Sequence, residues 1–161
     1  MSIDIRMLLD SDEKQRCARQ VLEDLKIWFA NEPNREDYIA KCGELPLWAA
    51  FDTDDNCVGF FAGTTHYGHV GEIVVCGVMQ SAHGKGVGKA IFTQMERYYK
   101  ELGCDIMLVK TLSDIVDDAD YAATRKFYES VGFVPLITLT EMWDEQNPCL
   151  IMIKNLMGEQ L

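Results

Sequence analysis

Residues 78–92, VMQSAHGKGVGKAIF, place three glycines within five positions and continue directly into a helical pattern. Without side chains at Gly84, Gly86 and Gly88, the backbone can come close to another molecule. Amide N–H groups in the first turn of a helix have no partner within that helix, and the positive end of the helix dipole lies beside them. Such a turn favours an anion such as a diphosphate, and Lys85 and Lys89 add positive charge next to it.

The glycines are expected to join a strand to a helix. Residues 69–79 form an apolar run that is typical of a strand, and residues 104–110 form another. Between them, apolar residues recur at helical spacing up to Gly103, which is expected to end the helix: Val87, Ile91, Met95, Tyr98 and Leu102. A strand, a helix and a second strand in succession predict a parallel or mixed region in the sheet.

Further elements are expected on either side of this region. Alternating or β-prone residues predict five more strands, at residues 2–9, 45–52, 57–67, 133–141 and 149–154. Three more helices are expected after the acidic residues 10–13, at 34–41, and at 121–131, where Gly132 ends the helix. In the first of these helices four apolar residues keep helical spacing: Cys17, Val21, Leu25 and Trp28. We expect residues 45–79 to form an antiparallel meander.

Length and composition limit the class of protein. A chain of 161 residues with 48% apolar residues, no linker and no repeat predicts a single domain over residues 1–161. A net charge of −11 opposes the binding of nucleic acid. No apolar run reaches the ~20 residues that cross a bilayer, so we expect a cytoplasmic protein without membrane contact. Six scattered cysteines without CxxC spacing indicate reduced thiols, and no metal site is expected.

The glycine stretch fits neither of two common nucleotide-binding motifs. GKGVGK has the wrong glycine spacing for a P-loop and lacks the Ser or Thr after its final lysine. It also departs from the GxGxxG pattern of dinucleotide-binding proteins. Taken alone, the stretch favours a tight strand-to-helix turn that carries two solvated lysines, because short glycine patterns recur by chance.

His83–Gly88 resembles the acyl-coenzyme A signature of the GNAT superfamily of N-acetyltransferases, (Gln/Arg)-x-x-Gly-x-(Gly/Ala), with histidine in the first place. Two further segments are similar to this family. Residues 71–79, GEIVVCGVM, resemble the fourth strand of its histone-acetylating branch, in which a glutamate precedes the signature by eleven residues, as Glu72 precedes His83. Residues 124–135, TRKFYESVGFVP, resemble the second family motif, with Tyr128 in the FY pair. The similarity covers about residues 45–155.

The resemblance implies the GNAT fold, an α/β (α+β) architecture with a mixed, mostly antiparallel twisted sheet of about seven strands flanked by about four helices. It implies acetyl-CoA as the acetyl donor, no metal, and direct attack of a primary amine on the thioester in a ternary complex. An alkylamine with an ordinary pKa of ~10.4 arrives protonated, and the resemblance assigns its deprotonation to Glu72, directly or through water. It assigns protonation of the leaving thiolate to Tyr128. The implied coenzyme contacts are Val78, which supplies a backbone N–H for the oxyanion, and His83, Gly84, Lys85, Gly86, Val87, Gly88 and Lys89.

Three alternatives to this enzyme remain open. Tyr121 and Thr124 stand where the family commonly has asparagine and alanine. His83 and Tyr121 also fit a degenerate module that binds acyl-CoA without turnover. Retention of Glu72 and Tyr128 favours the enzyme. An unrelated nucleotide-binding α/β protein is the second alternative. The third is acetyl transfer through a cysteine, Cys76 or Cys149, for which no Cys/His signature is present.

The acceptor is expected to be a small-molecule or peptide amine, with a cationic amine favoured. Residues 42–84 and 127–153 carry no Lys or Arg but nine acids, namely Glu44, Asp52, Asp54, Asp55, Glu72, Glu129, Glu141, Asp144 and Glu145. By family position, residues 143–149, WDEQNPC, border the acceptor pocket with Trp143 as a wall, although an ordinary turn fits them equally. His66 and His69 indicate a turn near the substrate opening or plain surface. The last two strands also allow a homodimer.

Overall fold

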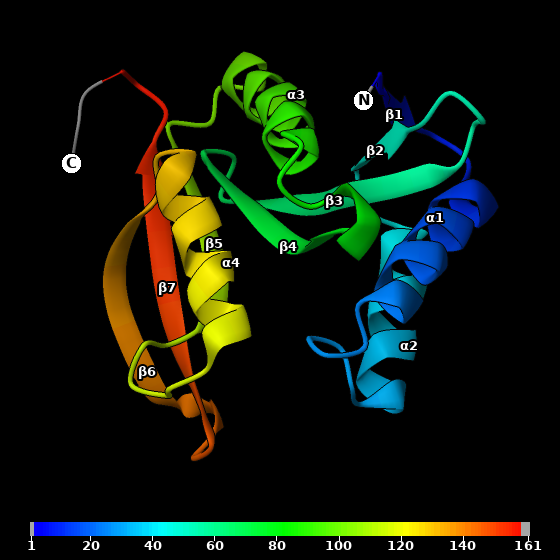
Figure 1. Cartoon of the computed structure of the whole chain (residues 1–161). Coiled ribbons are helices and arrows are strands. Elements are labelled where there is room, and N and C mark those ends of the chain that lie inside the picture. Colours follow the sequence, from blue (N-terminus) through cyan, green and yellow to red (C-terminus); the bar gives the residue numbers. More distant parts are fainter. Residues whose placement is uncertain (1, 159–161) are drawn as a thin grey trace. The chain divides into compact units, whose positions relative to one another are not determined.

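Within residues 2–158, seven strands lie in one sheet, in the order β1-β2-β3-β4-β5-β7-β6. The computed structural model describes residues 2–158, which also form four α-helices and a short 3₁₀ turn (Figure 1). Backbone contacts divide the chain into two compact units. One contains the residues up to Thr64 together with Val74–Tyr98, and the other contains Thr65–Ile73 and the residues from Tyr99 onward. The expected sheet and helices of the GNAT fold are confirmed.

The first unit begins with a strand and two helices that precede an antiparallel part of the sheet. Its elements are β1 (Asp4–Leu8), α1 (Ser11–Asp24), α2 (Glu32–Cys42), β2 (Leu47–Phe51), most of β3 (Cys57–His66), the second half of β4 (Val70–Val78), the 3₁₀ turn η1 (Gln80–Ala82) and most of α3 (Val87–Glu101). β2 pairs antiparallel with both β1 and β3, and its pairing with β3 belongs to the expected meander. The side chain of Asp10 accepts the Glu13 N–H and caps the start of α1.

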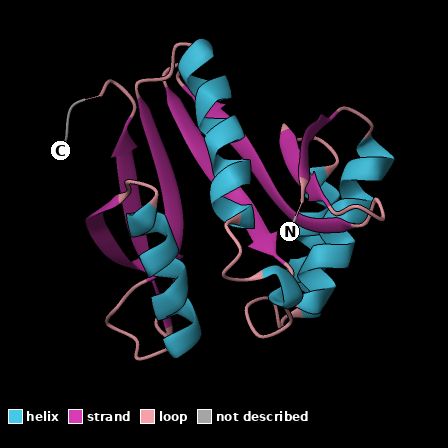
Figure 2. Cartoon of the chain, turned by 45° about the horizontal axis from the view of Figure 1, so that its top comes forward, coloured by secondary structure: helices cyan, strands magenta, loops and turns pink. Residues whose placement is uncertain are grey.

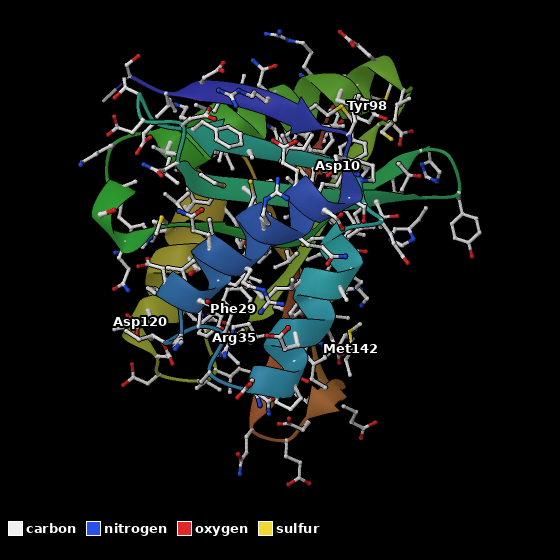
Figure 3. All side chains as sticks on the ribbon, turned by 90° about the vertical axis from the view of Figure 1, so that its right-hand side faces the viewer. Asp10, Phe29, Arg35, Tyr98, Asp120 and Met142 are labelled. Atoms are coloured by element: carbon white, nitrogen blue, oxygen red, sulfur yellow. The ribbon has the colours of Figure 1, made fainter. Side chains whose placement is uncertain are left out.

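Helix α1 ends earlier than its apolar spacing predicts. Leu25 already has non-helical dihedral angles, and Trp28 lies in the connection to α2. The buried Arg35 of α2 donates from Nη1 to the carbonyl oxygen of Phe29 at 2.8 Å (Figure 3). This bond holds the connection between the two helices in place.

Helix α3 follows the first three residues of the expected apolar stripe and then departs from it. Val87, Ile91 and Met95 are buried, but the next buried residue of the helix is Tyr99 rather than Tyr98. Leu102, the last residue of the expected stripe, lies beyond the helix and is 53% exposed. The helix ends at Glu101, and Gly103 lies just after it as predicted, with a φ of 92° that suits a residue without a side chain.

The second unit contains the parallel strand pair that the sequence predicts. Its further elements are β5 (Ile106–Leu112), α4 (Ala119–Ser130), β6 (Val134–Asp144) and β7 (Asn147–Asn155). The first half of β4 pairs parallel with β5, whereas β7 pairs antiparallel with both β5 and β6. Helix α4 lies alongside β5 and β7 (Figures 1 and 2). Asp118 caps its start, and Gly132, with a φ of 105°, follows its end.

All six cysteines lie within the described residues as free thiols, and five of them are buried. Burial raises the pKa of Cys42 to about 12. A hydrogen bond with Cys17, together with burial, raises the pKa of Cys57. Within residues 2–158, none of the helices combines the length and the apolar content that a membrane span requires.

The turn between β3 and β4 contains a strained tyrosine. Tyr67 has a φ of 53° and Gly68 a φ of 73°, and His69 N–H donates to the His66 carbonyl at 3.2 Å. Left-handed conformations at both central positions favour Asn-Gly, and a residue other than Gly pays a steric cost there. We expect Tyr67→Asn to stabilise the fold by about 0.5–1 kcal/mol, which corresponds to a rise in Tm of about 1–4 °C.

Differential scanning calorimetry measures this change, and Tyr67→Phe is the control because it keeps the same backbone strain. The Tyr67 side chain is 98% exposed, so its loss removes little packing. A Tm for Tyr67→Asn that is equal to or below that of Tyr67→Phe would show that the backbone conformation is not the source of strain.

Candidate functional site

The glycine stretch forms an open corner before α3. Gly84 and Gly86 have φ angles of 73° and 78°, and a Cβ atom at either position would meet no atom within 4 Å. The first bond into the helix runs from Ala90 N–H to the Gly86 carbonyl at 3.0 Å. The N–H groups of the preceding helical residues, Val87, Gly88 and Lys89, therefore have no helical carbonyl to bind. This corner offers several backbone donors and an unobstructed approach to an anion.

Some residues of the corner carry positive charge at the surface, and one packs in the core. The side chains of Lys85 and Lys89 are exposed, whereas Val87 is 2% exposed and holds the start of α3 in the core of its unit. Gly88 lies in the first turn of the helix. The sequence expectation of a bare backbone with cations beside it agrees with this geometry.

His83 ties the corner to the end of strand β4. Its Nε2 donates to the carbonyl oxygen of Val78 at 2.6 Å, which requires the hydrogen to be on Nε2. The edge of its ring contacts Trp28, with the ring centroids 6.0 Å apart. Just before it, Gln80 N–H donates to Asp24 Oδ2 at 2.8 Å, and Gln80 Nε2 donates to the Asp24 carbonyl. The corner is thus braced by the last residue of α1, Asp24, and by Trp28 in the connection that follows.

Glu72, in the second unit, lies between a histidine and a lysine. Its side chain is 10% exposed, and its two oxygens have different partners. Oε1 lies 2.6 Å from Nε2 of His66, and Oε2 lies 3.5 Å from Nζ of Lys110. These three residues join the end of β3, the third residue of β4 and the parallel neighbour β5.

Sequence reasoning misses both partners of Glu72. It assigns His66 only to a turn or to plain surface, and it treats Lys110 as one residue of an apolar strand. Reversal of the chain at Tyr67–His69 brings the last residue of β3 beside the start of β4, where residues two positions apart share a face. The parallel register pairs Glu72 with Leu108, so Lys110 lies two residues further on the same face. The sequence signal that could have revealed this contact was a charged residue in each of two apolar strands, Glu72 in β4 and Lys110 in β5.

Tyr128 is buried on α4 in the same unit as Glu72. It is 5% exposed, and its ring contacts the edges of Phe127 and Phe133. Tyr121 and Thr124, the two departures from the family pattern, lie in the first turns of α4. The backbone N–H of Tyr121 donates to the capping residue Asp118. The described contacts bring Glu72 together with His66 and Lys110, whereas Tyr128 packs within its own aromatic cluster.

The two cysteines considered as acetyl carriers lie in surroundings of different kinds. Cys149 is fully buried on β7, and burial raises the pKa of its thiol. A raised pKa disfavours the nucleophilic thiolate. Cys76 is half-buried on β4. Among residues 2–158, no group of three or more His, Cys, Asp and Glu side chains is placed to hold a metal ion.

The segment expected near the acceptor forms the hairpin between β6 and β7. Trp143 is 45% exposed near the end of β6. Asp144 Oδ1 accepts the Gln146 N–H and the Asn147 side-chain amide, both at 2.9 Å, which fixes the turn. Glu141 and Glu145 are exposed. The residues therefore form an ordered turn with acidic side chains in solvent.

Comparison with known sequences gives one family. Residues 12–133 match the acetyltransferase (GNAT) family. The curated mycothiol acetyltransferase of Renibacterium salmoninarum is 36% identical over 91 residues, which is 52% of this chain and 25% of that protein. The chain thus spans about a quarter of the length of this relative.

Comparison with solved structures gives the same fold. A structure from Desulfovibrio desulfuricans assigned to the GNAT family has a TM-score of 0.81 at 16% identity, over 96% of this chain and 99% of that one. An aminoglycoside 6'-N-acetyltransferase complexed with coenzyme A has a TM-score of 0.73 at 16% identity, over 98% of this chain and 99% of that one. At these identities the likeness concerns the fold alone.

Proposed function

Because the chain belongs to the GNAT family of acetyltransferases, we propose that it transfers an acetyl group from acetyl-CoA to a primary amine. The observation that carries this proposal is the open corner at Gly84 and Gly86 directly before α3. The amine would attack the thioester directly, in a complex that contains both substrates. Acetyl-CoA supplies the activated acetyl group, and the chain supplies binding, orientation and proton transfer.

The residues of the corner fit a diphosphate. Backbone donors at Val87, Gly88 and Lys89, the left-handed glycines and the exposed Lys85 would together hold its negative charge. A side chain at Gly84 or Gly86 would project into the space through which the phosphates approach. His83 would act by holding the corner against Val78, because its Nε2 already donates to that carbonyl. The N–H of Val78 remains the proposed donor to the oxyanion.

Two side chains of the second unit would move protons. The Glu72 carboxylate supplies the negative charge that draws a proton from the incoming ammonium, directly or through an intervening group. Tyr128 would donate its hydroxyl proton to the leaving thiolate, which has an intrinsic pKa of ~8.5. Both roles come from family position, and the burial of both side chains supports them because low water content strengthens proton-transfer contacts.

The acceptor is proposed to be a cationic amine. Exposed acids in both units, among them Asp54, Asp55, Glu141 and Glu145, give the described surface a negative field that attracts positive charge. Polyamines, aminoglycosides and lysine peptides are the amines to test first. Acetylation of neutral or acidic amines only, with none in this set, would contradict the assignment.

We expect acetyl-CoA at 100 times its Kd to stabilise the native protein by about 2.7 kcal/mol, or about 5–10 °C in Tm. Coenzyme A should give a similar shift and ATP none. A coupled assay of thiol release across the amine panel then measures turnover. A thermal shift without thiol release for any amine would support the module that binds acyl-CoA without turnover. No shift with either coenzyme form would overturn the proposed site.

A further inference from the structure

The carboxylate of Glu72 is nearly buried and already has a partner at each oxygen. His66 lies against one of its oxygens at 2.6 Å and Lys110 lies 3.5 Å from the other. The side chain is 10% exposed, so an incoming ammonium has little open surface through which to reach it and would compete with these two groups. Displacing a partner from a buried carboxylate costs more than the same exchange in water. A direct proton transfer from the substrate to Glu72 is therefore obstructed by its own neighbours.

His66 is accessible to solvent, whereas Glu72 is nearly buried. Its side chain is 44% exposed, at the end of β3. An ionised carboxylate oxygen only accepts hydrogen bonds, so Nε2 of His66 carries the hydrogen that faces Glu72. In the neutral imidazole this leaves Nδ1 with a lone pair. Among residues 2–158, no protein atom forms a hydrogen bond with Nδ1 of His66.

We infer that His66 is the catalytic base of the acetyl transfer and that Glu72 is a positioning residue behind it, an inference that rests on the proposed function. The N–H bond of the substrate ammonium breaks, its electron pair stays on nitrogen as the nucleophile, and the proton forms a bond with Nδ1. The imidazolium that results is stabilised by the Glu72 carboxylate, which also fixes the tautomer. The exposed ring then returns the proton to water.

The charges around His66 are compatible with this role. The Glu72 carboxylate on β4 lies between the imidazole of His66 and the ammonium of Lys110 on β5. When His66 takes up a proton, its new positive charge is therefore next to the negative charge of Glu72. The thiol of Cys149 on β7, within range of Glu72 and Lys110, is neutral because burial raises its pKa. In the adjoining turn His69 is bound to Asp105 at 2.9 Å. This second pair of a histidine and a carboxylate provides a matched control.

The test compares His66→Gln, His69→Gln and Glu72→Gln in the full chain by thiol release as a function of pH. Glutamine at position 66 can still donate to Glu72 but has no basic nitrogen. We expect His66→Gln to lower kcat about 100-fold, with the KM for acetyl-CoA within about threefold of wild type. The remaining rate of His66→Gln should rise about tenfold per pH unit, because the fraction of the substrate amine that is unprotonated rises by that factor. His69→Gln should stay within about twofold of wild type.

A second variant separates chemistry from folding. In His66→Ala, added imidazole should restore a saturable part of kcat, which a purely structural defect would not show. Wild-type kcat in His66→Gln, together with a large loss in Glu72→Gln, would overturn the inference and make Glu72 the direct base. Absence of turnover in the wild type, with acetyl-CoA bound, would instead refute the proposed function and this inference with it. The acetyl-CoA thermal shift of each variant shows whether the coenzyme site is intact.

Discussion

Replacing Gly86 by alanine is expected to weaken the binding of acetyl-CoA more than about tenfold. Gly86 has a φ of 78°, a conformation that costs a residue with a side chain about 1–2 kcal/mol. The new Cβ would meet no atom of the chain within 4 Å, so the free protein suffers strain but no clash. The methyl group would lie where the phosphates approach the backbone N–H groups. Titration calorimetry measures the loss of affinity.

Gly103→Ala is the matched control for this substitution. Gly103 lies after the other end of α3 and has a φ of 92°, and a methyl group added there would also meet no atom within 4 Å. Both variants should lose similar stability, about 1–2 kcal/mol. Only Gly86→Ala should lose affinity for acetyl-CoA. Equal affinity in the two variants would refute the role of the corner in coenzyme binding.

Replacing Tyr128 by phenylalanine is expected to lower kcat about 100-fold and to leave the KM for acetyl-CoA nearly unchanged. The substitution removes one oxygen and keeps the ring contacts with Phe127 and Phe133, so folding should be little affected. If Tyr128 is the proton donor that we propose, its loss should slow the departure of the thiolate. Steady-state thiol release gives both constants.

Tyr98→Phe serves as the control for loss of a phenol hydroxyl. Tyr98 lies on α3 and packs against Trp48, with ring centroids 5.1 Å apart. It has no assigned part in catalysis, and its variant should retain wild-type kcat. If Tyr128→Phe also retains wild-type kcat, another group protonates the thiolate, and the role assigned by family position is wrong.

Features that depend on neighbouring residues in the sequence were predictable. The glycines before α3, the glycine that follows the end of that helix at Gly103 and the parallel pairing of β4 with β5 follow from local spacing and from the order of elements. Glu72 and Tyr128 are identified through the resemblance of their segments to the motifs of the GNAT family. Their roles in the reaction stay predictions.

Features that depend on distant contacts were not predictable. The apolar spacing of α1 continues to Trp28, but the helix ends at Asp24, which binds the backbone and side chain of Gln80, 56 residues away. Apolar spacing within one segment carries no information about such long-range hydrogen bonds, so it cannot predict where they end a helix.

The choice between two neighbouring tyrosines on α3 has a similar cause. Tyr98 and Tyr99 both fit a helical stripe that begins at Val87. Tyr99 is the one that is fully buried, and a Cβ at Gly71 would lie only 2.9 Å from its ring. The missing side chain at Gly71 therefore makes room for the Tyr99 ring. The contact of His66 with Glu72 also depends on residues that are brought together by folding, because it requires a particular register of the hairpin between β3 and β4. The sequence alone therefore does not predict it.

The burial of the thiols has a practical consequence for enzymology. Chromogenic disulfides detect released coenzyme A by reacting with thiolates, and any reactive cysteine of the enzyme consumes them as background. Cys42, Cys57 and Cys149 are buried and have raised pKa values, so they should react slowly with such reagents at about pH 8. The half-buried Cys76 is the first residue to replace if a fast burst of colour precedes turnover.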